Sequence, residues 1–133
     1  MEKIRWGILG TGSIAHKFAD GLSVLPDAEL VAVGSRTQEA ANKFAGEFGV
    51  ARPHGSYEAL AADPDVDVIY IATPHPYHLA NSILCLEQGK HVLCEKPVTV
   101  NGRQLEEVLA AAHKANRFFM EAMWMYFTPN VCK

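Results

Sequence analysis

Short apolar runs alternate with segments whose apolar residues recur at helical spacing along almost the whole chain. The short runs are nearly continuous in apolar residues, as expected for strands that are covered on both faces. We expect these strands at 4–9, 29–34, 50–52 (short and weak), 66–72, 91–94 and 118–122. Alternation of such strands with helices is typical of βαβ units and a parallel sheet.

Helices fill the gaps between the strands, because apolar residues there repeat at i, i+3, i+4 and i+7. The expected positions are 15–22, 41–48, 57–62, 77–88 and 105–112. Gly89 suits the left-handed position after a helix, and Asn101 with Gln104 forms a capping pair before the fifth helix. The sequence therefore predicts the α/β class and a doubly wound fold with a mostly parallel, six-stranded sheet.

The composition is that of an ordinary globular protein. The chain has 133 residues, 49% hydrophobic and 20% charged, which excludes collagen-like, disordered and disulfide-scaffold classes. A formal net charge of -3 offers no electrostatic surface for nucleic acid or anionic lipid. The longest stretch without Lys, Arg, Asp or Glu, 68–86, is broken by prolines and histidines, so no membrane span is expected. Three cysteines, an odd number, favour reduced thiols in a cytoplasmic protein.

A glycine-rich turn follows the first expected strand and opens the first helix. Its pattern is G-x-G-x-x-A, made by Gly10, Thr11, Gly12, Ser13, Ile14 and Ala15. The first glycine permits the tight turn, the second lets the backbone approach a pyrophosphate, and the alanine lets helix and strand pack closely. The helix N-terminus then presents free N–H groups to phosphates. A plain βα turn also favours glycine, but the context predicts dinucleotide binding.

The end of the second strand bears on the choice between NAD and NADP. NAD-binding sites usually carry an acidic residue there to hold the ribose 2′-hydroxyl, and this sequence has Ser35, Arg36 and Thr37 instead. Arg36 can pair with a 2′-phosphate, while Ser35 and Thr37 can donate hydrogen bonds. The alternative is an ordinary surface arginine followed by the N-cap of the second helix. We expect NADP to be preferred over NAD.

Two more loops follow strands and lie at the same edge of the sheet, where ligands bind in open α/β folds. The first loop carries Thr73, Pro74, His75 and His78, and the second carries Glu95 and Lys96. The histidines lack the spacing of a metal site, so we expect no metal. Lys96 can act as a proton donor or acceptor, with Glu95 to orient it. The alternatives are surface or supporting histidines and a solvated Glu-Lys pair.

The order of these motifs resembles the Gfo/Idh/MocA oxidoreductase family. That family carries G-x-G-x-x-[GA], a T-P-N-x-x-H-like loop and a G-K-H-V-x-x-E-K-P run, which correspond to 10–15, 73–78 and 89–97 here. His75 stands where many members have Asn. The stretch 120–124 is similar to the branch of dihydrodiol dehydrogenases and NADP-dependent xylose dehydrogenases. The resemblance covers nearly the whole chain.

The resemblance implies roles for residues that match the family's motifs. Gly10, Gly12 and Ala15 would hold the pyrophosphate, and 35–37 would recognise the ribose next to the adenine. The loop residues Thr73, Pro74 and His78 would line the cofactor cleft. Glu95 and Lys96 would lie beside the nicotinamide, with Lys96 as the catalytic lysine and Glu95 as its partner. Family members continue into a domain built on an antiparallel sheet, which supplies the substrate pocket.

We therefore expect a dinucleotide-binding domain at 1–122, with 123–133 as the start of a crossover to a second domain that this chain lacks. The segment 123–127 (MWMYF) is large and apolar. It either packs on the chain's own sheet edge or meets a second domain or subunit, and we expect a homo-oligomer formed through it. On this interpretation the isolated chain turns over little substrate.

Three function classes compete. The first is hydride transfer between NAD(P) and a sugar, polyol or cyclic diol, with a small-molecule substrate bound once a second domain completes the site. The second is an isolated module that binds NADP(H) or associates with itself without turnover. The third is a methyltransferase-type nucleotide fold, which leaves the Glu95-Lys96 loop unexplained.

Overall fold

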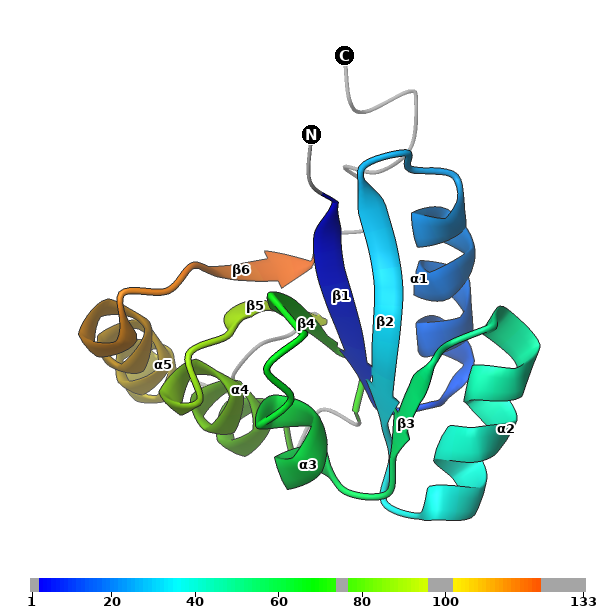
Figure 1. Ribbon diagram of the computed structural model, residues 1–133. Coiled ribbons are helices and arrows are strands. Elements are labelled where there is room, and N and C mark those ends of the chain that lie inside the picture. Colours follow the sequence, from blue (N-terminus) through cyan, green and yellow to red (C-terminus); the bar gives the residue numbers. More distant parts are fainter. Residues whose placement is uncertain (1–2, 74–76, 96–101, 123–133) are drawn as a thin grey trace.

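The chain folds into three layers, a parallel sheet between two layers of helices (Figure 1). The coordinates are a computed structural model that describes residues 3–73, 77–95 and 102–122. The strands are β1 (Ile4–Leu9), β2 (Ala28–Gly34), β3 (Arg52–His54), β4 (Val68–Ile71), β5 (His91–Glu95) and β6 (Phe119–Ala122). The helices are α1 (Ser13–Ser23), α2 (Gln38–Phe48), α3 (Tyr57–Ala61), α4 (His78–Glu87) and α5 (Gly102–Ala115).

The strand order is β3-β2-β1-β4-β5-β6, and every neighbouring pair is parallel. The chain winds outward from β1 to β3 and then returns to place β4 on the other side of β1. This is the arrangement of dinucleotide-binding folds, in which ligands bind at the carboxyl ends of the strands where the winding reverses. The expected doubly wound α/β fold is confirmed.

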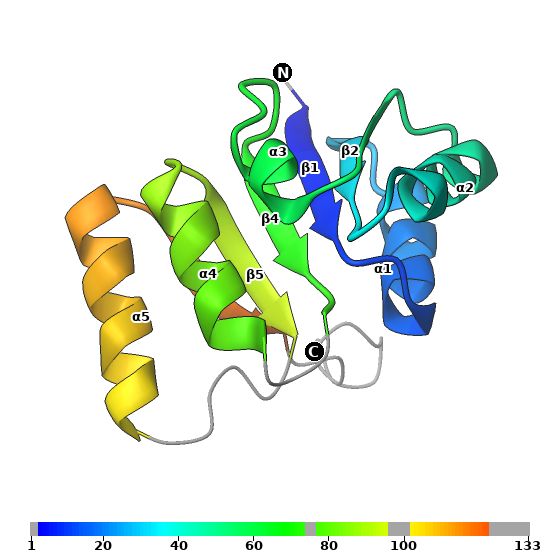
Figure 2. The same cartoon turned by 90° about the horizontal axis from the view of Figure 1, so that it is seen from below.

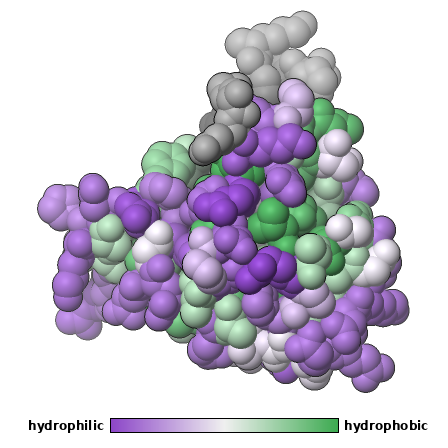
Figure 3. Space-filling view, in the orientation of Figure 1, coloured by the Kyte–Doolittle hydropathy of each residue, from purple (hydrophilic) through white to green (hydrophobic). Residues whose placement is uncertain are grey.

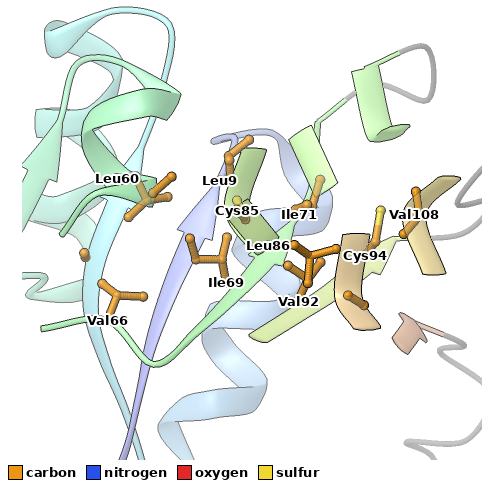
Figure 4. Packing of buried hydrophobic residues seen from close by; sticks show 13 residues of the cluster. Leu9, Leu60, Val66, Ile69, Ile71, Cys85, Leu86, Val92, Cys94 and Val108 are labelled. Carbon is orange, nitrogen blue, oxygen red and sulfur yellow. The ribbon is translucent and has the colours of Figure 1, made fainter. Parts of the chain in front are cut away.

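Two apolar clusters hold the layers together. On one face, α3, α4 and α5 pack against the sheet through residues such as Leu60, Leu86 and Val108 (Figure 4). On the other face, α1 and α2 pack through Phe18 and Phe44, and Figure 2 shows the helices on their two sides of the sheet. Alternate residues of the strands contribute to the two clusters, as the period of two in a strand requires.

Strand glycines make room for the short helix α3. A Cβ added to Gly34 at the end of β2 would lie 2.8 Å from the Cβ of Leu60, and one added to Gly7 of β1 would lie 3.0 Å from its Cδ1. Leu60 is fully buried. The two glycines therefore let α3 approach the sheet closely, immediately below the edge where β1 and β2 end.

The structure differs from the sequence expectation at several elements. Strand β4 spans Val68–Ile71 and not 66–72, and two further differences have a clear physical reason. The weak third strand begins at Arg52 and not at residue 50. Val50 lies just after α2 and takes part in capping it, because its N–H donates to the Ala45 carbonyl at 2.9 Å. Helix α5 buries Val108 and Ala112, but Leu105 and Leu109 are 40% and 49% exposed. Only half of its expected apolar face is therefore covered by the described residues.

The surface is mixed, with hydrophilic side chains interrupted by apolar patches on the face shown in Figure 3. Among the described residues, no helix combines the length and the apolar character that a membrane crossing needs. Asn101, the expected capping residue, and the segment 123–133, the expected start of a crossover, lie outside the described residues.

A carboxylate fixes the start of β1 to the start of β4, at the sheet edge opposite to the glycine-rich turn. Asp67 accepts hydrogen bonds from the Arg5 N–H at 2.9 Å, from its Nε at 3.1 Å and from its Nη2 at 3.0 Å. The hydrogen bonds from the Arg5 side chain lower the pKa of Asp67, against an opposing effect of burial. The ionised form of Asp67 therefore stabilises the fold.

This pairing predicts a specific loss of stability in acid. Because the pKa of Asp67 is lower in the folded than in the unfolded chain, its contribution is complete above its ordinary pKa of 3.8 and disappears as the pH falls through the folded pKa. We expect Asp67→Asn to cost about 1 kcal/mol near neutral pH, a value that allows for screening of this partly exposed pair. Thermal unfolding of both proteins from neutral pH to strong acid measures the difference.

The difference in Tm between the two proteins should be constant above about pH 5 and shrink toward zero in strong acid. Asp20→Asn is the matched control, since Asp20 is exposed on α1 and the described residues give it no ion pair. A Tm difference for Asp67→Asn that persists unchanged into strong acid would refute the role of its charge.

Candidate functional site

A cavity of about 540 Å³ lies at the carboxyl edge of the sheet, where β1, β2 and β4 end. Its volume is in the range of small-molecule sites. The lining consists of the glycine-rich turn, the end of β2 and two flanking loops: Gly10, Thr11, Gly12, Ser13, Ile14, Ser35, Arg36, Thr37, Ala40, Tyr57, Ala72 and Thr73. Four parts of the chain that are far apart in the sequence thus meet at one site. Three of them carry motifs that were expected at this edge of the sheet.

The two glycines of the turn serve different purposes. Gly10 has a φ of 105°, which favours glycine, and an added Cβ would lie 3.1 Å from the carbonyl carbon of Ala72. Gly12 has ordinary extended backbone angles, and an added Cβ would meet no atom of the protein within 4 Å. Gly10 is therefore required for the turn, whereas the missing side chain of Gly12 leaves open space in the cavity.

Helix α1 begins in the cavity without a capping side chain. Thr37 Oγ1 accepts the Ala40 N–H at 3.2 Å at the start of α2, and Ser56 Oγ accepts the Ala59 N–H at 3.1 Å at the start of α3. The start of α1, at Gly12, has no side-chain cap and no acidic residue in its first turn. Its first N–H groups and the positive end of the helix dipole face the cavity, an arrangement that binds phosphate.

The end of β2 forms the second part of the lining. Ser35 is buried, its N–H donates to the His54 carbonyl at 3.1 Å, and its hydroxyl lies 3.4 Å from the Thr11 hydroxyl. Arg36 is exposed at the cavity. Thr37 caps α2, so the N-cap alternative is realised, although Thr37 also lines the cavity. None of the lining residues in the described part of the chain is Asp or Glu.

Tyr57 is a lining residue that the sequence analysis missed. It opens α3 directly after β3, and burial raises the pKa of its hydroxyl, while the charge of Arg36 acts in the opposite direction. The hydroxyl is therefore protonated at neutral pH and can donate a hydrogen bond. Its position after the third strand, at the same edge as the other motifs, is the signal that would have identified it.

The loop after β4 is held by buried hydrogen bonds. Thr73 Oγ1 donates to Asn81 Oδ1 at 2.7 Å, and His78 Nε2 lies 2.5 Å from the Thr73 carbonyl. His78 is only 2% exposed and is not among the residues that line the cavity. In this structure His78 and Asn81 support the loop from beneath, while Thr73 forms part of the wall.

Glu95 lies at the end of β5 and does not line the cavity. The hydroxyl of Tyr70, on β4, donates a short hydrogen bond to Glu95 Oε2. Ala15 is fully buried between α1 and the sheet, so it acts through packing and not by lining the cavity. Pro74, His75 and Lys96 lie outside the described residues.

Comparison with protein families gives an oxidoreductase family. The family described as "Oxidoreductase family, NAD-binding Rossmann fold" (Gfo/Idh/MocA) matches residues 4–123. The chain is 48% identical over 127 residues to trans-1,2-dihydrobenzene-1,2-diol dehydrogenase of Xenopus laevis, and 45% identical over 128 residues to the human protein of that name. These alignments cover 94% and 95% of this chain but 38% of each relative. The chain thus spans well under half the length of these relatives.

Solved structures have the same fold. KijD10, a 3-ketoreductase from Actinomadura kijaniata solved with NADP, superposes with a TM-score of 0.91 at 33% identity, over 97% of this chain and 41% of that protein. An NAD-binding oxidoreductase from Klebsiella pneumoniae superposes with a TM-score of 0.89 at 30% identity, over 98% of this chain and 37% of its own.

Proposed function

Because the chain belongs to the Gfo/Idh/MocA family of NAD-binding oxidoreductases, we propose that its cavity binds NADP(H) in preference to NAD(H). The observation that carries this proposal is the composition of the lining. Arg36 lies at the end of β2, and none of the described lining residues is a carboxylate that could bind the ribose 2′-hydroxyl of NAD. The uncapped start of α1 and the open space at Gly12 are suited to a pyrophosphate.

In this proposal different lining residues bind different parts of the cofactor. The N–H groups at the start of α1 hold the pyrophosphate beside Gly12. Arg36 pairs with the 2′-phosphate, and the hydroxyls of Ser35, Thr37 and Tyr57 are available to donate hydrogen bonds around it. Thr73 forms the wall on the side of β4, held in place by Asn81.

The bound cofactor supplies a nicotinamide ring that donates or accepts a hydride. Glu95 is the last residue of β5, and Lys96 follows it in the sequence. In this proposal both contribute to the nicotinamide side of the site. In this proposal Lys96 donates a proton to the substrate oxygen, or takes one from it, and Glu95 orients that lysine. In this proposal the proton is therefore transferred between the substrate and Lys96, a residue of the cofactor-binding domain.

The proposed substrate is a small molecule with a secondary alcohol or carbonyl carbon, of the sugar, polyol or cyclic-diol class. The dihydrodiol dehydrogenases among the relatives favour the cyclic diol within this class. They also support an oxidoreductase over a binding module without turnover, and over a methyltransferase. The relatives are longer than this chain, so we propose that substrate binding requires residues beyond those described here.

Replacing Arg36 tests the preference for NADP. We expect Arg36→Ala to weaken NADPH binding by about tenfold to a hundredfold, the effect of losing charge-assisted hydrogen bonds to a phosphate. Binding of NADH, which has no 2′-phosphate, should change by less than about threefold. Arg36 can make only ordinary hydrogen bonds to NADH, without the charge of a phosphate. Calorimetric titration of both variants with both cofactors measures the two affinities.

Lys43→Ala is the matched control for charge. Lys43 is an exposed cation on α2 that does not line the cavity, so its loss alters the net charge equally. It should leave the ratio of NADPH to NADH affinity unchanged. If Arg36→Ala also leaves that ratio unchanged, Arg36 does not recognise the 2′-phosphate and the proposed preference is wrong.

A further inference from the structure

Tyr70 carries a polar group into a part of the core where apolar atoms would suffice for packing. The residue is fully buried on β4, and its ring stacks on that of Phe18 from α1, with centroids 3.8 Å apart and planes 6° apart. Phe18 in turn packs edge-on against Trp6 at 5.3 Å. A phenylalanine would fill the same place, whereas a buried hydroxyl costs free energy unless it is hydrogen-bonded.

The hydroxyl of Tyr70 donates a hydrogen bond to Glu95 Oε2 at the carboxyl edge of the sheet. Leu93 belongs to the cluster on the α1 face and Cys94 to the cluster on the opposite face. Glu95 therefore points to the α1 face again, above Tyr70. The stack on Phe18 fixes the phenol ring, and the phenol fixes the half-buried carboxylate.

The strand order indicates which part of a dinucleotide would lie near Glu95. In the proposed binding mode, the adenosine lies at the end of β2 and the pyrophosphate at the end of β1, where the cavity is lined by 35–37 and 10–14. The next strands along the edge are β4 and β5, so the other nucleotide extends toward them. Two strand spacings separate β1 from β5, about 10 Å, which is within the reach of a nucleotide past the pyrophosphate.

We propose that Tyr70 is a positioning residue for the nicotinamide half of the site: its hydroxyl holds the carboxylate of Glu95 toward the nicotinamide riboside. This inference rests on the proposed binding of NADP(H). In this proposal Tyr70 acts on the cofactor through Glu95, to which its hydroxyl donates. Its effect is therefore confined to one half of the ligand, which separates positioning from a general contribution to the fold.

The charge of the carboxylate gives the proposal a second signature. The nicotinamide ring is positively charged in NADP⁺ and neutral in NADPH. A carboxylate that is held toward the ring stabilises the oxidised form more than the reduced form. Removal of the Tyr70 hydroxyl removes the hydrogen bond that it donates to this carboxylate. The affinity for NADP⁺ should therefore fall more than the affinity for NADPH.

The experiment is a calorimetric comparison of Tyr70→Phe with the unaltered chain, using three ligands. NADP⁺ and NADPH contain the nicotinamide riboside, whereas 2′,5′-ADP contains only the adenosine side with its 2′-phosphate. We expect Tyr70→Phe to weaken NADP⁺ by about tenfold and NADPH by about threefold, from the loss of one hydrogen bond to a charged group. Affinity for 2′,5′-ADP should be unchanged, and thermal unfolding verifies that the variant is folded.

Tyr57→Phe is the matched control, because it removes a tyrosine hydroxyl from the adenosine side of the cavity. Any loss in that variant should be equal for all three ligands. Glu95→Gln should reproduce the pattern of Tyr70→Phe, and the double variant should lose little more than either one, since both act through the same carboxylate.

The outcomes separate this inference from the proposed function. If Tyr70→Phe weakens the binding of all three ligands by the same factor, Tyr70 has a purely structural role. If Tyr70→Phe binds each ligand as tightly as the unaltered chain does, the hydroxyl does not position Glu95. Either result overturns the inference and leaves NADP(H) binding intact. If the unaltered chain binds neither 2′,5′-ADP nor NADPH, the proposed function fails and this inference fails with it.

Discussion

Replacing Gly12 with valine is expected to abolish NADPH binding while leaving the fold intact. The backbone of Gly12 is in the extended region, with φ −79° and ψ −172°, so a β-branched residue is accommodated. An added Cβ meets no protein atom within 4 Å, and the side chain occupies the space in front of the first turn of α1. We expect at least about a hundredfold loss of affinity, or about 2.7 kcal/mol.

The contrast with Gly10 makes this test specific. Gly10→Ala should lower both stability and binding, because Gly10 has a positive φ and an added Cβ lies 3.1 Å from the backbone of Ala72. Gly12→Val should lose binding in a titration yet keep the Tm of the unaltered chain. If Gly12→Val binds NADPH normally, the pyrophosphate does not lie against this turn and the assigned orientation of the cofactor is wrong.

The largest expected effect on stability is at Gly34. Gly34→Ala places a Cβ 2.8 Å from the Cβ of Leu60, an atom that cannot move without the backbone of α3. We expect a loss of about 2 kcal/mol, from overpacking of a filled core. For a chain of this size that corresponds to a fall of roughly 8 °C in Tm, measured by calorimetry or circular dichroism.

Gly21→Ala is the matched control for Gly34→Ala. Gly21 lies within α1, and an added Cβ there meets no atom within 4 Å. It should raise stability by about 0.5–1 kcal/mol, because alanine loses less conformational entropy than glycine in a helix. A Gly34→Ala chain as stable as the unaltered one would mean that α3 does not press on the end of β2, and the geometry of the adjacent site would need revision.

The fold followed from local patterns that tertiary contacts hardly altered. Strand β1 has the bounds that its apolar run predicts, and Gly89 has the positive φ expected after a helix. The third strand was misplaced because its three residues have too weak an apolar pattern to show where α2 ends and the strand begins. There the hydrogen bond of Val50 to α2 decided the boundary.

The site was predicted unevenly. The glycine-rich turn and the stretch 35–37 were identified because their residue types are tied to a strand end, and both segments line the cavity. Tyr57 was missed because no motif marks it. The sequence did not indicate a role for Tyr70 either, because an aromatic residue in an apolar run is typical of a core residue. The structure shows that its hydroxyl donates a hydrogen bond to Glu95.

A calorimetric titration of the 133-residue chain with NADPH and then with NADH shows whether the cavity at the carboxyl edge of the sheet is an NADP(H) site. We expect one NADPH site per chain and weaker binding of NADH, because only NADPH presents a 2′-phosphate to Arg36. Equal affinities, or no heat with either cofactor at about millimolar concentration, where even a weak site of about −4 kcal/mol would be half filled, would contradict it.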